Sequence, residues 1–584
     1  MMFRSRRSPK TDLVPKTKRQ TTLVKQRAEK IKPDARLLAA LEPGFAIRNS
    51  LAPLCRAGAV TLVAAPNREQ FQKHRSHLEA AFGAVVHRAA NEDGIRSGVI
   101  RVSSPAMARK ATRYTCPRES CRHWSGGWTA ALLIAILVTV AFFAIAAPQF
   151  VIVALTVWAT STLVGVCGLR TAGALMQLRA SRTFGETWQS SRPKAMKENS
   201  YPRLSLLVPL FKETDIADRL IERLGRLDFP KNRLDVLLIL EHGDAETAAA
   251  LDDADLPDWI HIITVPPGNP QTKPRALNYA LDFAKGDIVG VYDAEDAPAP
   301  NQLRTVVETF AAAPPNVACL QGVLDFYNAR NTWLTRCFAI DYATWFRLVL
   351  PGLVRMGFVI PLGGTTVFFR REILEKVGRW DAHNVTEDAD LGIRLARRGY
   401  KTEFISSVTL EEATATVPTW IKQRSRWIKG YFMTWGVHMR QPIRLFRELG
   451  LKKFFGFQIL FFGTLSQFVL APFLWSFWLV LLGMPHPLLD IAPWSIVVTL
   501  GATFLLCEVA TITTLALAVA TPRHRGLIWW VPLMHLYFPM SAVASWKAIW
   551  EIVVRPFYWD KTSHGGKFSR PKRRWHRQPL PHPA

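Results

Sequence analysis

From Gly127 to Leu169 the chain contains no charged residue, and this apolar run restricts how the protein can fold. Because about 20 apolar residues cross a bilayer as a helix, residues 127–169 predict two transmembrane helices, joined near Pro148. Basic residues stand at both ends, at Arg122 and Arg170. The positive-inside rule then predicts that the segment after the run is cytoplasmic. The chain must fold partly in lipid and partly in water.

Three more apolar stretches lie between residues 454 and 554. Arg523 and Arg525 place the loop before the last stretch in the cytoplasm, so three single spans would leave the basic tail 555–584 outside. Two solutions remain open: the last stretch is partly re-entrant or interfacial, or the first divides near Pro472. We therefore expect three to four membrane segments, followed by a basic cytoplasmic tail.

The net charge of +28 does not indicate a nucleic-acid partner. Lys and Arg cluster in the first 35 residues, near Arg109 to Arg122 and after Arg555, where they flank apolar segments. The positive-inside rule accounts for such clusters, and no basic stripe interleaved with aromatic residues accompanies them. Seven scattered cysteines predict reduced thiols rather than a disulfide framework.

The N-terminal part divides into a basic tail and a small domain. Residues 1–35 are rich in Lys and Arg and are expected to be disordered. Strand-like patterns at 59–65 and 84–90 surround a helical pattern at 68–82, which predicts a small α/β domain at 36–120. It distantly resembles the N-terminal domain of type II secretion ATPases. A regulator-docking role in a secretion complex and a plain packing role both remain open.

Between Leu204 and Phe404 short apolar runs alternate with helix-like segments. The runs SLLVPL, DVLLILE, IHIITV and DIVGVYD are typical of buried strands, and the alternation predicts a mainly parallel sheet covered on both faces by helices. Ligands bind at the carboxyl ends of the strands in such sheets. The polar residues that end the strands are therefore the candidate site.

Carboxylates and a lysine occupy these strand ends. Asp293 begins DAED after one strand, where chelating oxygens suit a divalent cation that bridges a diphosphate; a solvated acidic loop is the alternative. Glu213 and Glu241 close two other strands, which favours a ligand site. Lys273 stands at the start of a helix, where both its charge and the helix dipole favour diphosphate oxygens.

A second acidic cluster, Glu387 and Asp388, opens a helix in WDAHNVTEDADLG. Acidic residues in a first helical turn are ordinary stabilisers. However, they follow PLGGTTVFFR, whose Gly-rich turn lets a ligand approach the backbone. This position favours catalysis, with one carboxylate taking the proton from an acceptor hydroxyl.

The segment QRSRWIKG, from Gln423 to Gly430, lies between the α/β segment and the later apolar stretches. Arg426 offers a fork that suits phosphate oxygens, and Trp427 offers a flat apolar face to the CH groups of a pyranose. The alternative for Trp427 is an interfacial anchor, because tryptophan favours that depth in membranes.

Taken in order, Glu213, Glu241, DAED, TED and QxxRW, with membrane helices on both sides, resemble the processive family-2 glycosyltransferases. This group contains cellulose, hyaluronan, chitin-oligosaccharide and curdlan synthases. LPGLVR, PLGGTT and FYWDKTSHG are most similar to a bacterial subgroup of β-glucan or exopolysaccharide synthases. The resemblance implies an α/β GT-A domain, Rossmann-like with a mainly parallel sheet, at 200–430. It would end in interfacial helices and be inserted between the transmembrane helices.

The resemblance also implies roles for individual residues. Asp388 would be the general base, with Glu387 beside it as the second catalytic residue. The nucleotide sugar would be bound by Glu213, Glu241, Lys273 and Asp293. The acceptor end and the leaving diphosphate would be bound by Gln423, Arg426 and Trp427. Mg²⁺ or Mn²⁺ would be held by Asp293 with Glu295 or Asp296, because either carboxylate can be the second metal position.

These roles predict a hexosyltransferase of the bacterial inner membrane. It would use a UDP-sugar, with UDP-glucose favoured, to extend a β-glucan by inversion and pass the polysaccharide across the bilayer. The alternatives are a non-processive transferase that makes a glycolipid and an inactive scaffold of a secretion complex. Glu508, inside an apolar stretch, would line the polysaccharide channel. The pattern from Arg573 to Arg577 resembles a cyclic-dinucleotide site of related synthases.

Overall fold

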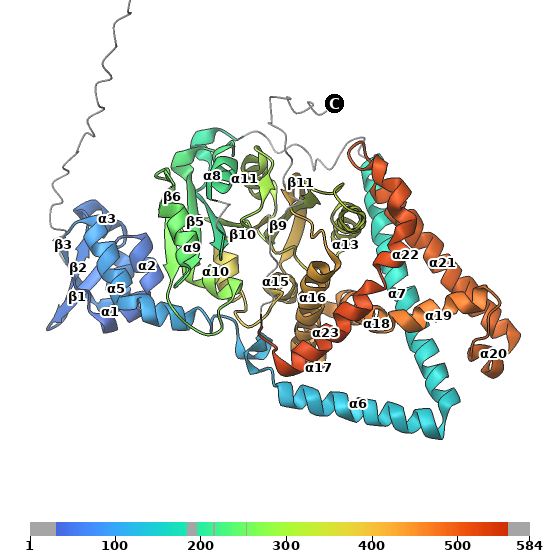
Figure 1. Cartoon of the computed structure of the whole chain (residues 1–584). Coiled ribbons are helices and arrows are strands. Elements are labelled where there is room, and N and C mark those ends of the chain that lie inside the picture. Colours follow the sequence, from blue (N-terminus) through green and yellow to red (C-terminus); the bar gives the residue numbers. More distant parts are fainter. Residues whose placement is uncertain (1–30, 184–195, 214–216, 253, 559–584) are drawn as a thin grey trace, which may run out of the picture. The chain divides into compact units, whose positions relative to one another are not determined.

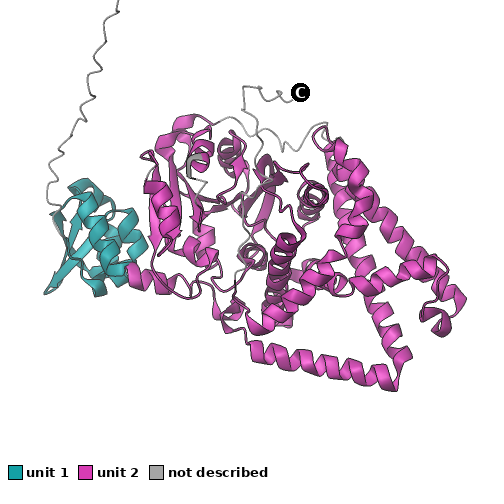
Figure 2. Ribbon diagram, in the orientation of Figure 1, with its two compact units in different colours: residues 1–103 teal, residues 104–584 magenta. Residues whose placement is uncertain are grey.

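The computed structural model describes residues 31–183, 196–213, 217–252 and 254–558. The chain forms two compact units, Met1–Ser103 and Ser104–Ala584 (Figure 2). Most of the two expected basic tails, and the Arg573 to Arg577 pattern, lie outside the described residues.

The first unit is built around a three-stranded sheet of order β1-β2-β3. The first two strands pair antiparallel, and the last two pair parallel. The patterns at 59–65 and 84–90 correspond to β2 and β3. The strands are β1 (Ala52–Ala57), β2 (Val60–Ala65) and β3 (Ala84–Ala89), and the helices are α1 (Ala35–Leu41), α2 (Pro43–Arg48), α3 (Arg68–Lys73), α4 (Arg75–Phe82) and the first part of α5 (Glu92–Lys110), whose end belongs to the second unit.

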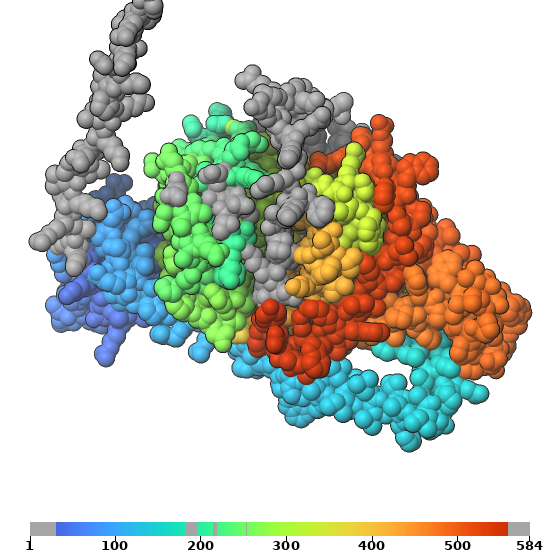
Figure 3. All heavy atoms as spheres, viewed as in Figure 1, coloured from blue at the N-terminus to red at the C-terminus, as the bar shows by residue number. Residues whose placement is uncertain are grey.

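The uncharged run folds into two helices, α6 (Gly126–Ala146) and α7 (Pro148–Thr183), which meet at Pro148. The Ser125 side chain accepts a hydrogen bond from the Trp128 amide and so caps α6. The side chains of α6, cyan in Figure 3, are largely exposed, as expected for a lipid-facing helix. The second helix continues well past Leu169, where the uncharged run ends.

Among the described residues, four helices are long and apolar enough to cross a membrane, or up to six if each of two bent pairs is one span. The bends are 68° after Val469, next to Pro472, and 47° after Tyr537. The first bend lies where the sequence suggested a division, and the second lies within the stretch expected to be partly re-entrant or interfacial. One of the four helices, Trp333–Arg355, was not expected from the sequence; most of it is buried inside the protein, so packing accounts for its apolar character.

The second unit contains an eight-stranded sheet of order β6-β5-β4-β7-β10-β9-β11-β8 (Figure 1). The apolar runs of the sequence form its parallel half, β6 to β7, and β9 and β11 are also parallel. Antiparallel pairs join β10 to both its neighbours and β11 to β8, so the sheet is mixed and mostly parallel. The strands are β4 (Leu204–Leu210), β5 (Leu234–Glu241), β6 (Ile260–Val265), β7 (Ile288–Val291), β8 (Ala297–Pro298), β9 (Val317–Phe326), β10 (Val367–Arg370) and β11 (Lys401–Glu411).

Helices cover this sheet and bury its apolar side chains. The core contains Leu206, Val236 and Phe368, each buried without residual exposure. Helix α10 packs on the parallel strands, and α11 packs on β9 and β11. The helices between the strands are α8 (Ala217–Gly225), α9 (Ala245–Asp252), α10 (Lys273–Leu281), α11 (Gln302–Ala312), α12 (Trp333–Ala343), α13 (Leu350–Arg355), α14 (Arg371–Lys376) and α15 (Glu387–Arg397).

Helix α16 (Val417–His438) carries QRSRW and packs against α23 (Met540–Val554). A buried ion pair joins them, because Lys429 Nζ lies 2.9 Å from Glu551 Oε2. The segment that bears the motif is thus held by the C-terminal helices. The remaining helices are α17 (Pro442–Phe457), α18 (Thr464–Val469), α19 (Ala471–Leu481), α20 (Leu488–Ile491), α21 (Trp494–Ala518) and α22 (Met534–Tyr537).

Candidate active site

A cavity of about 790 Å³ opens at the carboxyl ends of β4, β5 and β7. Glu241 and Asp293 line it at the strand ends, and Asp388 and Trp427 line it farther along. It continues between the apolar helices as far as Glu508. Residues far apart in the sequence therefore border one continuous space.

Lys273 occupies the first position of α10 and bridges two parts of the site. Its Nζ donates to Asp293 Oδ1 and, at 3.1 Å, to the carbonyl oxygen of Gly364. Burial disfavours the charged amine, but the carboxylates of Asp293, Glu387 and Asp388 more than offset this and raise the pKa of Lys273. The Lys273 side chain is therefore positively charged and held in position beside the strand ends.

Glu241, at the end of β5, faces an arginine that the sequence did not single out. Arg275 Nη1 lies 3.2 Å from Glu241 Oε2, and the Arg275 side chain is completely buried. Burial raises the pKa of Glu241, although Arg275 opposes this effect. Glu213 also lines the cavity, and its backbone amide donates to Thr247 Oγ1 at 2.9 Å.

The DAED carboxylates lie at different depths. Asp293 and Glu295 line the cavity, whereas Asp296 is only 1% exposed and lies beneath them. Asp296 Oδ2 accepts hydrogen bonds from the Asp293 amide and the Thr365 hydroxyl, while its buried Oδ1 has no hydrogen-bond partner among the residues that the structure describes. Burial, together with the charges of Asp293 and Glu295, raises the pKa of Asp296.

Glu411, at the end of β11, adds a fourth carboxylate. Burial and the charges of Asp296, Glu295 and Asp293 raise its pKa well above the ordinary value. Among the described residues no three His, Cys, Asp or Glu side chains converge closely enough to hold a metal by themselves. Mg²⁺, however, is commonly bound by one or two carboxylates plus substrate phosphates. The carboxylates of Asp293 and Glu295, which both line the cavity, with the charge of Asp296 beneath them, fit such a cation.

Glu387 and Asp388 begin α15. Burial and the Asp388 charge raise the pKa of Glu387 to about 8. Burial also raises the pKa of Asp388, to about 6, against the opposing effects of the Ala389 amide, Lys273 and Arg426. Burial and mutual repulsion therefore favour one shared proton on the pair near neutral pH, which leaves one carboxylate able to accept a proton.

The start of α15 is held in place from two sides. Gly364, with φ of +74°, brings its backbone so close that a Cβ there would lie 2.6 Å from Asp388 Oδ2. On the opposite side, buried Asp390 accepts from Arg394 Nε at 2.7 Å and lies 3.0 Å from His438 Nε2 on α16. Neither Gly364 nor His438 stood out as a support of Asp388 from sequence alone.

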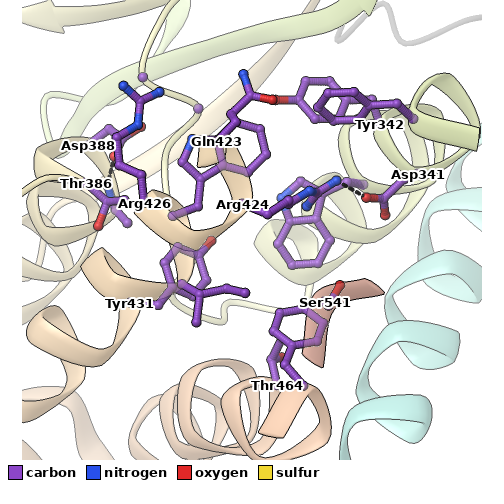
Figure 4. A pocket seen from close by; sticks show the side chains of 18 of the residues that line it. Asp341, Tyr342, Thr386, Asp388, Gln423, Arg424, Arg426, Tyr431, Thr464 and Ser541 are labelled. Atoms are coloured by element: carbon purple, nitrogen blue, oxygen red, sulfur yellow. Dashed lines mark hydrogen bonds and ion pairs between the residues drawn. The ribbon is translucent and has the colours of Figure 1, made fainter. Parts of the chain in front are cut away.

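The motif on α16 turns its polar and aromatic side chains into the cavity. Gln423, Arg426 and Trp427 all line it. Figure 4 shows Asp388, Thr386 and Arg426 together on one side of the cavity, and Arg424 paired with Asp341 on the other. The Trp427 ring lies 6.1 Å from the Phe338 ring and 6.2 Å from the Tyr342 ring. Its partners therefore come from α12, an element that the sequence did not connect with the motif.

Ionisable groups also occur at the far end of the cavity. Glu508 on α21 and His535 on α22 both line it, and Glu508 Oε2 lies 3.6 Å from His535 Nδ1. Charged and imidazole side chains inside apolar helices usually face a polar path or a partner. Here they do both.

Residues 202–430 match the model of the family described as glycosyltransferase like family 2. A probable glycosyltransferase of Bacillus subtilis is 28% identical over 249 residues, which cover 42% of this chain and 59% of the relative. A beta-monoglucosyldiacylglycerol synthase of Synechocystis is 30% identical over 304 residues, 49% of this chain and 61% of the relative. The catalytic subunit of cellulose synthase 1 of Komagataeibacter xylinus is 26% identical over 263 residues, 43% of this chain and 33% of the relative.

All eight strands of the larger sheet lie within residues 202–430, the part of the chain that is similar to the family-2 glycosyltransferases. The chain spans less than two thirds of the length of each of these three relatives. The apolar helices around the domain suggest membrane association.

Proposed function

We propose that the protein is a membrane-embedded, inverting glycosyltransferase that polymerises a β-linked polysaccharide and moves it across the bacterial inner membrane. UDP-glucose is the favoured donor and a β-glucan the favoured product. The observation that carries this proposal is the single cavity that runs from Asp293 and Asp388, past Trp427, to Glu508 between apolar helices. A chain made at the strand ends would have space to extend toward Glu508.

The donor would bind at the strand ends. Glu213 and Glu241 would contact the nucleotide, and Lys273 would face the diphosphate from the start of α10, where helix dipole and charge both favour phosphate oxygens. Mg²⁺ or Mn²⁺ would be held by Asp293 with Glu295 or Asp296 and, when bound, would stabilise the charge on the leaving diphosphate. The depth of Asp296 favours Glu295 as the contact and Asp296 as its support.

Asp388 would remove the proton from the acceptor hydroxyl. The charges of Lys273 and Arg426 favour the ionised form of Asp388, and one proton shared with Glu387 would leave a carboxylate to act as the base. With a single base opposite the diphosphate, the acceptor oxygen attacks in line with the departing group. An α-linked donor would therefore yield a β-linkage.

The acceptor would lie along α16. Trp427 would support the terminal sugar with its ring face, and Gln423 would bind a hydroxyl. Arg426 lies close enough to lower the pKa of Asp388 through its charge and would also bind the leaving diphosphate. The growing chain would then pass Glu508 and His535, whose polar atoms suit sugar hydroxyls within an apolar surround.

The flanking segments complete this proposal. The glycosyltransferase domain would be cytoplasmic, with α6 and α7 before it and the bent C-terminal helices after it. The N-terminal unit would bind a regulator or a secretion complex. A cyclic dinucleotide is a further candidate regulator, whose expected motif lies outside the described residues.

A second candidate is a non-processive enzyme that adds one sugar to a lipid. The 30% identity to the Synechocystis beta-monoglucosyldiacylglycerol synthase favours it, and the apolar lining of the cavity would also accept acyl chains. An inactive scaffold is not favoured, because the comparisons indicate an enzyme.

The test is to incubate the purified protein in lipid with several UDP-sugars, and to measure UDP release and product size. Linkage-specific glycosidases then identify the product. We expect UDP-glucose to give polymer that a β-glucanase digests. Short glycolipid without polymer would select the second candidate, and absence of UDP release would contradict both.

A further inference from the structure

Arg424, the second residue of QRSRW, lies inside a box of aromatic rings. Its guanidinium carbon is 4.9 Å from the centre of the Trp427 ring, three residues further along the same helix. Such a spacing places the two side chains on one face of α16. Three more rings surround the same guanidinium, at 5.0 Å for Phe338, 5.3 Å for Trp420 and 5.8 Å for Tyr537.

Two polar groups fix the guanidinium within this box. Arg424 Nη2 donates to Asp341 Oδ2 at 2.5 Å and to the Tyr537 hydroxyl at 2.6 Å. The Tyr537 hydroxyl in turn accepts a hydrogen bond from Trp420 Nε1 at 3.2 Å. A charge-assisted bond and a planar stack both restrict the orientation of an arginine. Figure 4 shows the Arg424–Asp341 pair at the wall of the cavity.

We propose that Arg424 is a positioning residue that orients the Trp427 ring for the acceptor sugar. This inference rests on the proposed role of Trp427. On one side the ring has Phe338 and Tyr342 of α12 as its neighbours, and Arg424 holds it from its own helix. Because stacking on a sugar depends on the angle of the ring, holding the indole in advance lowers the cost of binding.

We call Trp427 and the residues that hold it, Asp341, Arg424 and Tyr537, the acceptor platform. It is assembled from three segments. Asp341 comes from α12, Arg424 and Trp427 from α16, and Tyr537 from α22. The last of these follows the apolar helix α21 in the chain. Removing one hydroxyl on α22, more than a hundred residues after the motif, should therefore weaken acceptor binding.

A direct contact between Arg424 and the leaving diphosphate is the competing explanation. The carboxylate of Asp341 already neutralises the Arg424 charge, and Nη2 is engaged twice. Arg426, in contrast, acts on Asp388 through its charge and lies with it on the other side of the cavity. The two arginines of the motif thus have separate roles. Arg424 orients Trp427, whereas Arg426 binds the leaving diphosphate and acts on Asp388.

The experiment compares Arg424→Lys, Tyr537→Phe and the double variant, in the full chain in lipid. Steady-state kinetics are measured against UDP-glucose and against a short β-linked gluco-oligosaccharide. We expect Arg424→Lys to raise the acceptor KM about tenfold, with the donor KM within about twofold of the parent value. Tyr537→Phe should act in the same direction, and the double variant should be no worse than Arg424→Lys alone, because one contact is lost in both.

Arg336→Lys is the matched control. Arg336 stacks on Trp530 at 4.4 Å, and neither residue lines the cavity. Both KM values should stay at the parent level in this variant. An unchanged acceptor KM in Arg424→Lys, a rise in the donor KM instead, or an equal effect of Arg336→Lys would overturn the proposal.

Failure of the proposed function would be visible separately. If the parent enzyme makes only glycolipid, the same variants are assayed with diacylglycerol as the acceptor. A rise in the diacylglycerol KM would then keep Arg424 as a positioning residue of the acceptor site but overturn sugar as the acceptor, and no rise would overturn the positioning role as well.

Discussion

Replacing Gly364 by alanine tests whether the position of the Asp388 carboxylate controls the reaction. Gly364 has φ of +74°, and a Cβ built there would stand 2.6 Å from Asp388 Oδ2. Ordinary contact begins near 3.4 Å, so the carboxylate and the added methyl must separate by about 0.8 Å. Asp388 belongs to α15, which the buried Asp390–His438 pair ties to α16. The Asp388 carboxylate therefore has little freedom to move away from the added methyl group.

The expected effect of Gly364→Ala has two parts, a loss of stability and a loss of catalytic rate. A left-handed backbone conformation costs a residue with a Cβ about 1–2 kcal/mol, which should lower the melting temperature of the protein. A displacement close to 1 Å of a catalytic group can reduce the rate about 100-fold. Gly364→Ala should therefore combine a modest loss of stability with a large loss of kcat/KM.

The variant Gly357→Ala separates the loss of stability from the loss of rate. Gly357 has the same φ of +74°, but no atom of the described part of the chain lies within 4 Å of its Cβ position, and it does not line the cavity. This control should show the loss of stability with nearly normal kcat/KM. Melting curves and UDP-release kinetics on both variants complete the assay. If both variants have the same kcat/KM, the argument that Gly364 positions Asp388 is refuted.

Three more predictions concern the acid groups of the cavity. Asp388→Asn should abolish transfer while UDP still binds, as measured by UDP release and calorimetry; measurable turnover would show that another group is the base. In the parent enzyme, kcat/KM should fall as the pH drops below about 6, because the raised pKa of Asp388 means that the base becomes protonated there; a rate that is flat from pH 5 to 7 would contradict this. Glu508→Leu should reduce polymer output without changing UDP binding, and unchanged output would count against a polysaccharide path along α21.

Much of the fold is encoded locally and could be predicted. The uncharged run predicted α6 and α7, and the four apolar runs predicted β4 to β7, because continuous apolarity distinguishes buried strands and membrane helices. The antiparallel arrangement of β10 between β7 and β9 was not predicted. Strand direction depends on where the connecting segments return, which no short sequence pattern specifies.

The candidate site was predictable to a similar extent. The strand-end acids, Lys273 and the motif residues are recognisable because their chemistry is carried by their own side chains, and the structure places them on one cavity. Arg275 was missed because a buried arginine inside QTKPRALNYAL has no local signature. Its pairing with Glu241 exists only after β5 and α10 pack together.

Local chemistry therefore determined the types of segment and the candidate reactive groups: apolar runs long enough for a bilayer, carboxylates after strands, and an arginine and a tryptophan before the last helices. Tertiary packing decided which of these groups face one another. The pairing of Arg424 with Asp341 and Tyr537, the hydrogen bond from Thr365 to Asp296, and the close approach of Gly364 to Asp388 all join segments distant in the chain. Such contacts arise from the folding of whole elements onto one another, so no single stretch of sequence contains them.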